Sequence, residues 1–158
     1  MNLKPRTISP GTANVLGVET FQRDVSEVTR ARHWIAGEVL PGLDPKGQAR
    51  DALQICTSEC ATNAVRHGDA GSEFGVIVVR CPSSAARPSA IRVEIIDGGN
   101  SQKGAPRMLP DNPNGFAQKG RGLRIVAEYA TAWGYGKDPD GSGHVVWFEI
   151  PDEQPDAP

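Results

Sequence analysis

The sequence predicts an α+β fold in which helices cover one face of an antiparallel or mixed β-sheet. Several short runs of alternating or continuous apolar residues indicate strands. Segments with the 3.6-residue apolar spacing of helices lie between these runs. Short turns rich in glycine, proline and serine join neighbouring strand candidates, as in hairpins. This order of elements favours a two-layer sandwich with one helical layer and one sheet.

The chain of 158 residues is expected to form a single domain over residues 18–150. Residues 1–17 and 151–158 are polar and rich in turn-forming residues, so we expect both ends to be flexible. Hydrophobic residues make up 38% of the chain and charged residues 23%, which is typical of a soluble globular protein.

Charge and hydropathy exclude several classes of protein. The net charge of −2 provides no basic surface for direct binding of nucleic acid. No apolar run approaches the roughly 20 residues that cross a bilayer, and the first residues lack the apolar centre of a signal peptide. We therefore expect a cytoplasmic protein that contacts neither nucleic acid nor membrane directly.

The cysteines indicate neither a disulfide framework nor a zinc site. Their number is odd: Cys56 and Cys60 lie one helical turn apart, and Cys81 stands alone before Pro82. No second pair of cysteines or histidines has metal-binding spacing. We interpret Cys56 and Cys60 as small buried packing residues.

The first half of the chain predicts one strand and two helices. The strand is expected over Val18–Arg23, and Asp24 then offers a helix cap with capping-box spacing to Glu27. This helix is expected to continue to about Leu40, where Pro41-Gly42 ends it. A second helix is expected from Asp44-Pro45 to Gly68.

The second half predicts four strands, one helix and a long irregular segment. Residues 100–119 show no periodicity and are rich in glycine and proline, which indicates a functional lid or a disordered insertion. The helix is expected over Leu123–Tyr129. The strands are expected over Phe74–Arg80, Ile91–Asp97, Thr131–Gly136 and His144–Ile150.

Three polar residues share one face of the second predicted helix. Glu59, Asn63 and His67 are four residues apart, so they lie nearly above one another. Such a stripe can be the solvated face of an amphipathic helix, or one wall of a chemical site. A neighbouring stripe suits packing against a sheet and consists of Leu53, Cys56, Cys60 and Ala64.

Two glycine-containing motifs follow this helix. A buried strand ends on Asp97 and is followed directly by Gly98 and Gly99. Later, the run Gly120-Arg121-Gly122-Leu123 opens a helix, whose amides could hold phosphate. Each motif alone also fits an ordinary turn or helix start. The chain contains no Walker-type phosphate loop.

In this order the motifs resemble those of the GHKL (Bergerat-fold) ATPases, the superfamily of gyrase-type topoisomerases, ninety-kilodalton heat-shock chaperones, mismatch-repair ATPases and sensor histidine kinases. The resemblance covers roughly residues 20–150. The spacing of Glu59, Asn63 and His67, the Gly-Arg-Gly-Leu run and the last strand look most like bacterial anti-sigma-factor serine/threonine kinases and related single-domain ATP-binding regulators. The same two-layer sandwich is implied.

The resemblance implies that the domain binds ATP and Mg²⁺. Asn63 would supply an oxygen ligand to the magnesium ion, which usually takes only one or two ligands from protein. Glu59 would be the catalytic base that orients the attacking oxygen. His67 would contact phosphate or a metal-bound water, or would simply satisfy the last carbonyl groups of its helix.

The two glycine motifs would hold the rest of the nucleotide. Asp97 would accept the exocyclic amine of adenine, and Gly99 would let the backbone approach the base. Phosphate would be bound by Gly120, Arg121, Gly122 and Leu123. The chain departs from the family pattern at two positions: Ser101 replaces a glycine, and Val145 is interpreted as replacing the threonine that helps the aspartate hold adenine.

The resemblance leaves two functions open. The first is an anti-sigma-type kinase that phosphorylates an anti-anti-sigma antagonist and otherwise holds a sigma factor inactive. The second is a non-catalytic, nucleotide-gated protein-binding module. Glu59 favours the kinase, whereas Ser101 and Val145 favour the module. The partners would be a sigma factor, an antagonist or both, and a homodimer stays open. A sensor histidine kinase is disfavoured because the sequence shows no phosphoacceptor helix pair. A DNA-acting ATPase is disfavoured by the length and the net charge of the chain.

Overall fold

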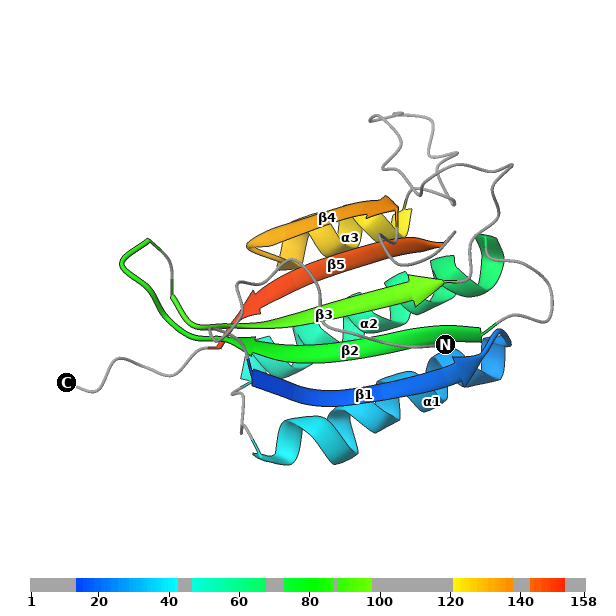
Figure 1. Cartoon of the computed structure of the whole chain (residues 1–158), viewed down its shortest axis with the longest axis horizontal. Helices are drawn as coiled ribbons and strands as arrows, with labels where there is room; N and C mark the ends of the chain where they lie inside the picture. The colour runs from blue at the N-terminus through cyan, green and yellow to red at the C-terminus, as the bar shows by residue number, and fades with distance from the viewer. Residues whose placement is uncertain are drawn as a thin grey trace.

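The computed structural model of the chain describes residues 14–42, 47–67, 73–86, 88–97, 121–137 and 143–152. Within these ranges, five strands form an antiparallel sheet in the order β1-β2-β3-β5-β4, and three α-helices lie on one face of it (Figure 1). This confirms the predicted two-layer α+β sandwich and selects the antiparallel alternative. The strands are β1 Asn14–Gln22, β2 Glu73–Cys81, β3 Ala90–Asp97, β4 Ala132–Lys137 and β5 His144–Pro151; the helices are α1 Val25–Trp34, α2 Gly47–His67 and α3 Arg121–Tyr129.

The main core lies between the helices and the sheet face turned toward them, which we call the inner face. Alternate residues of the central strands point into this core because side chains alternate along a strand. On β3 and β5 they are Ile91, Val93, Ile95, Val146, Phe148 and Ile150. The apolar stripe predicted for α2 is confirmed as buried and consists of Leu53, Cys56, Cys60 and Ala64. Among the described helices, none is long and apolar enough to cross a membrane.

The boundaries of the first strand and helix differ from the prediction. β1 begins at Asn14, four residues before the predicted start, and its pairing with β2 shifts register between Val15 and Gly17. The predicted helix to Leu40 is helical throughout, but α1 ends at Trp34. A π-helical turn, η1 (Ile35–Val39), and a 3₁₀ turn, η2 (Leu40–Gly42), follow. The predicted stop at Pro41-Gly42 falls within η2, and residues 43–46, which would test it, lie outside the described residues.

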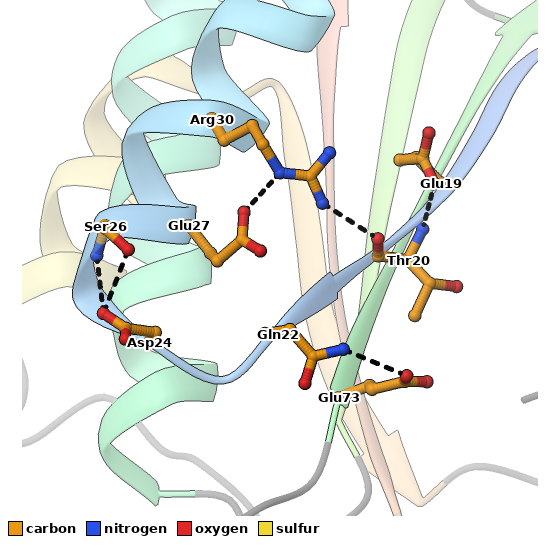
Figure 2. A network of polar contacts seen from close by, with 8 residues as sticks. All are labelled: Glu19, Thr20, Gln22, Asp24, Ser26, Glu27, Arg30 and Glu73. Carbon is orange, nitrogen blue, oxygen red and sulfur yellow. Dashed lines mark hydrogen bonds and ion pairs between the residues drawn. The ribbon is translucent and has the colours of Figure 1, made fainter.

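The junction between β1 and α1 is capped by one side chain (Figure 2). Asp24 has extended backbone angles, and its carboxylate accepts hydrogen bonds from the N–H of Ser26 at 3.0 Å and the hydroxyl of Ser26 at 3.1 Å. Asp24 therefore satisfies a free amide of the first helical turn. The predicted capping box does not form, because the carboxylate of Glu27 pairs with Arg30 instead.

Arg30 ties α1 to the edge strand β1 (Figure 2). Its guanidinium donates to the carbonyl of Thr20 at 3.3 Å and lies over the ring of Phe21, 4.4 Å from the centroid. The N–H of Thr20 donates to the side chain of Glu19 at 2.9 Å. The side chains of Arg30 and Glu19 therefore form hydrogen bonds with the backbone carbonyl and N–H of Thr20 on this edge strand. Unpaired backbone groups of an edge strand can otherwise pair with a strand of another chain.

The opposite face of the sheet, which we call the outer face, carries a buried ionic cluster. Arg92 donates to Glu94 on its own strand at 3.0 Å and to Glu149 on β5 at 3.1 Å. Its guanidinium also lies over the ring of Trp147, 4.0 Å from the centroid. An apolar cluster shares this face and consists of Ile77, Val79, Ile96 and Val145.

The contact between β1 and α1 predicts a sharp difference between two glycine substitutions. A Cβ at Gly17 would lie 2.9 Å from a ring carbon of Trp34 and 3.0 Å from Val39, whereas a Cβ at Gly37 would meet nothing within 4 Å. Trp34 packs edge-on against Phe21, so its ring has little room to move. We expect Gly17→Ala to lower the free energy of unfolding by about 1–3 kcal/mol. Gly37→Ala, the control, should be neutral or stabilising by up to about 1 kcal/mol. Urea unfolding would measure both, and equal effects would contradict this packing.

The buried thiols of α2 predict a loss of stability at alkaline pH. Burial, assisted by the negative charge of Glu59, raises the pKa of Cys56 from 9.0 to about 12. Because the folded pKa is raised, the stabilising effect is complete below pH 9 and is lost as the pH rises from 9 toward 12. The free energy of unfolding should fall by about 1 kcal/mol between pH 8 and pH 10 on account of this thiol. Cys56→Ala should show a shallower pH dependence in urea titrations, and an unchanged slope would exclude Cys56 as the cause.

Candidate functional site

The segments that carry the predicted site residues meet at one end of the sandwich (Figure 1). β3 ends at Asp97, and β5, which is antiparallel to it, begins beside that end at His144. The C-terminal half of α2 and the first turn of α3 lie at the same end (Figure 1). Motifs that are dispersed along the sequence are therefore brought to one region of the structure.

The polar stripe of α2 has two different environments. The side chain of Asn63 is almost buried, with 8% of the residue exposed, whereas Glu59, one turn earlier, is half-buried. His67 is the last residue of α2, but its side chain lies outside the described part of the structure. Glu59 and Asn63 thus lie on the same side of the helix, where they present a carboxylate and an amide.

Glu59 opens onto a hollow between α1 and α2. The hollow has a volume of about 580 Å³ and is wide open to solvent. All of its lining residues except Ile55 are of polar or charged type; they are Arg32, His33, Asp51, Gln54, Ile55, Ser58 and Glu59. A hydroxyl group presented by another molecule can therefore approach the Glu59 carboxylate from outside.

A long-range hydrogen bond fixes the last turn of α2. The side chain of Arg23, in the turn before α1, donates through Nε to the carbonyl of Val65 at 2.7 Å. Carbonyl groups in the last turn of a helix have no partner within the helix, so this contact satisfies one of them. Arg23 is not predicted from the sequence, because a pair 42 residues apart leaves no local pattern.

Asp97 occupies the inner face at the end of β3. Its side chain is 11% exposed, and Oδ1 accepts a hydrogen bond from the backbone N–H of His144 at 3.1 Å. The imidazole Nδ1 of His144 is 3.8 Å from the same oxygen, and this side chain is 7% exposed. A carboxylate in such surroundings needs donors, and the start of β5 provides one.

The interpretation of Val145 as the neighbour of Asp97 is wrong. Val145 pairs with Ile96 and belongs to the apolar cluster of the outer face, on the side of the sheet away from Asp97. The residue beside Asp97 is His144. Counting back in twos from the buried Phe148 through Val146 reaches His144. The same pattern leaves Val145 apolar on the other face, so the pairing with β3 is needed to decide which residue lies beside Asp97.

The phosphate-binding motif is described only in part. α3 begins at Arg121, as expected for a helix opened by the glycine pair. The side chain of Leu123 is buried in the core at 1% exposure, so only its backbone amide could face a phosphate. Gly99, Gly120 and the predicted lid at 100–119, which includes Ser101, lie outside the described residues, as does the side chain of Arg121.

The donor groups present fit a magnesium nucleotide. Among the described residues, no three His, Cys, Asp or Glu side chains are grouped as in a site that binds a metal by itself. Mg²⁺ bound with a nucleotide takes most of its oxygen ligands from phosphate and water. A single amide oxygen, such as that of Asn63, is sufficient as the ligand from the protein.

Comparison with known proteins identifies the family. A search of curated proteins finds no match. A profile of the histidine kinase-like ATPase domain matches residues 21–150, a range that contains Glu59, Asn63, Asp97 and His144. This match extends over most of the chain, and the described architecture is that of the GHKL-type sandwich. The chain therefore belongs to the histidine kinase-like ATPase domain family, whose domain binds ATP.

Proposed function

We propose that this protein is an ATP-dependent serine/threonine kinase of the anti-sigma type. It phosphorylates an anti-anti-sigma antagonist and, when free of that antagonist, binds a sigma factor in the cytoplasm. The observation that supports a kinase most directly is the arrangement of Glu59 and Asn63. They lie one helical turn apart, the amide toward the interior and the acid at an open hollow.

The two residues have complementary roles in phosphoryl transfer. Asn63 would hold Mg²⁺, which neutralises the charge of the phosphates when it is bound. Glu59 accepts the proton of the acceptor serine or threonine hydroxyl. The freed oxygen bonds to the γ-phosphorus, the bond from that phosphorus to the bridging oxygen breaks, and ADP departs. Positioning of the reactants supplies most of the rate enhancement in such reactions.

The alternative is a nucleotide-gated module that binds a partner without catalysis. The argument for it from Val145 no longer applies, because this residue lies on the outer face. A half-buried carboxylate at an open hollow is what a kinase needs, whereas a binding module does not need it. The kinase is therefore the better supported function.

A substitution at Asn63 tests the metal ligand. Asn63→Ala should lower the affinity for ATP with Mg²⁺ by roughly tenfold, the loss expected for one charged contact. Affinity for ATP with EDTA should change little. Thr62→Ala is the control, because within the described residues the Thr62 hydroxyl bonds only to the Ser58 carbonyl of the same helix. Calorimetry would measure the affinity of wild-type protein and of each variant for ATP, with Mg²⁺ and with EDTA. Equal losses with and without magnesium would reduce Asn63 to a structural amide.

A substitution at Glu59 separates the two functions. Glu59→Gln should leave ATP affinity nearly unchanged, because the carboxylate acts on the attacking oxygen and not on the bound nucleotide. Phosphate transfer to a purified antagonist domain should fall by roughly 10²-fold or more. Asp51→Asn is a matched control, since it removes the same charge from another wall of the same hollow.

Radiolabelled ATP and a panel of antagonist domains encoded in the same genome would measure the transfer. If wild-type protein binds ATP tightly and transfers no phosphate to any of these domains, the kinase is excluded. If ATP also changes its affinity for a partner, the protein is the nucleotide-gated binding module. Equal loss of transfer in Glu59→Gln and Asp51→Asn would show a general effect of charge and not a catalytic base.

A further inference from the structure

The turn between β1 and α1 lies at the same end of the sheet as Asp97. The start of β2 pairs on one side with the end of β1 and on the other side with Asp97. The N–H of Asp24 donates to the carbonyl of Gln22 at 2.8 Å, and the Asp24 carboxylate caps α1 (Figure 2). Arg23 lies between these two residues, so its backbone belongs to a turn that is held by hydrogen bonds on both sides.

From this turn, Arg23 reaches the last turn of α2. Its Nε donates to the carbonyl of Val65 at 2.7 Å, in a contact that is partly shielded from solvent. This carbonyl is one of the last four of the helix, which have no N–H partner inside it. A guanidinium is a charged donor, and charge-assisted hydrogen bonds are stronger than neutral ones. The bond therefore opposes fraying, to which the ends of helices are prone.

Asn63 is held in place by the same helical turn. In an α-helix the N–H of residue 67 pairs with the carbonyl of residue 63, so this bond to the Asn63 backbone exists only while the last turn is formed. The direction of a helical side chain follows from its backbone. A ligand in a binding site must be held within about 0.5 Å of its productive position. Fraying of the last turn would therefore displace the amide of Asn63.

We propose that Arg23 is a positioning residue for the magnesium nucleotide. Through the carbonyl of Val65 it holds the last turn of α2, and with it the amide oxygen of Asn63. This inference rests on the proposed nucleotide site and adds to it a residue that acts through Asn63. The bond from Arg23 raises the affinity for ATP that is bound with Mg²⁺, and it has little effect on ATP without the metal.

The charge of Arg23 provides a different explanation, which the chain itself allows to be tested. A cation near the C-terminus of a helix is favoured by the helix dipole, whether or not it forms a hydrogen bond. Arg66 is an exposed cation in the same last turn of α2. Within the described residues its side chain makes no hydrogen bond. An effect of charge alone would therefore be shared by Arg66, whereas an effect of the bond to Val65 would be specific to Arg23.

The experiment separates the hydrogen bond from the charge. Arg23→Met keeps a side chain of similar length and removes the donor. Arg23→Gln removes the charge but keeps an N–H donor as many bonds from Cα as Nε is. Arg66→Gln is the matched control, because it removes a charge from the same turn and no hydrogen bond. Each substitution is made in wild-type protein and in Asn63→Ala.

Three measurements are made on every variant. Calorimetry measures the affinity for ATP with Mg²⁺ and with EDTA. Hydrogen exchange of the nucleotide-free protein measures how often the last turn of α2 opens. Urea unfolding checks that the variant is folded.

Arg23→Met should bind ATP with Mg²⁺ roughly three- to tenfold more weakly, as expected for the loss of one hydrogen bond. Its affinity for ATP with EDTA should change little, and the last turn of α2 should exchange faster. Arg23→Gln should retain most of the wild-type affinity, and Arg66→Gln all of it. In Asn63→Ala, Arg23→Met should cause no further loss, because the residue through which it acts is absent.

Equal losses of Arg23→Met with Mg²⁺ and with EDTA would overturn the proposal and make Arg23 a structural residue. The same loss in wild-type protein and in Asn63→Ala would also overturn it. A loss in Arg66→Gln as large as that in Arg23→Met would assign the effect to charge. If Arg23→Met does not fold, Arg23→Lys replaces it, since this variant keeps the charge and moves the donor by one bond. Its affinity must then fall with Mg²⁺ and not with EDTA, and any other result would overturn the proposal.

Failure of the proposal is distinguishable from failure of the proposed function. If wild-type protein binds ATP with Mg²⁺ and Asn63→Ala weakens this binding, but Arg23→Met has no effect, Arg23 alone is rejected. No binding of ATP by wild-type protein would reject the nucleotide site, and with it the kinase and the role of Arg23.

Discussion

The rotation of α2 about its own axis is the constraint on which the site depends. A helix advances about 100° per residue, so a rotation by one position would exchange buried and exposed residues. Cys56, Cys60 and Ala64 are small, and their burial against β3 and β5 brings the helix close to the sheet. With that stripe fixed, Asn63 is carried to the interior and Glu59 to the hollow beside α1. The packing of the apolar stripe thus sets the direction of the chemical groups.

The order, type and approximate limits of the elements could be predicted because each has a strong local pattern. The strands β2, β3 and β5 and the helix α2 combine clear apolar periodicity with turn residues at their ends. The predicted limits are wrong where contacts between residues far apart in the sequence determine where an element begins or ends. β1 extends to Asn14 because β2 offers a partner as far as Arg80, and α1 gives way to a π-helical turn while it packs against the core. Arg23, which fixes α2 from 42 residues away, has no signature in the sequence at all.

The register of the sheet explains the error at the end of β3 that carries Asp97. The start of β5 places apolar residues on both faces, Val145 outward and Val146 inward, so its composition alone does not say which of them faces the helices. The pairing of β3 with β5 decides this. Arg92 lies between two carboxylates, one on each strand, and a shift by one residue would move it to the core face. We interpret this buried cluster as a determinant of register more than of stability, since the desolvation of buried charges offsets much of their attraction.

The polar end of the inner face lowers the stability of the fold relative to a well-packed apolar end. Asp97 and His144 occupy positions that Ile, Val or Phe fill elsewhere on the same strands, and the structure offsets the burial of the carboxylate with a backbone donor from β5. Such departures from apolar packing concentrate at functional sites, where a ligand supplies the missing partners. A nucleotide that binds only the folded state would stabilise the domain in proportion to its affinity. The polar end of the inner face, which lowers the stability of the nucleotide-free domain, would therefore be the region through which a bound nucleotide raises that stability.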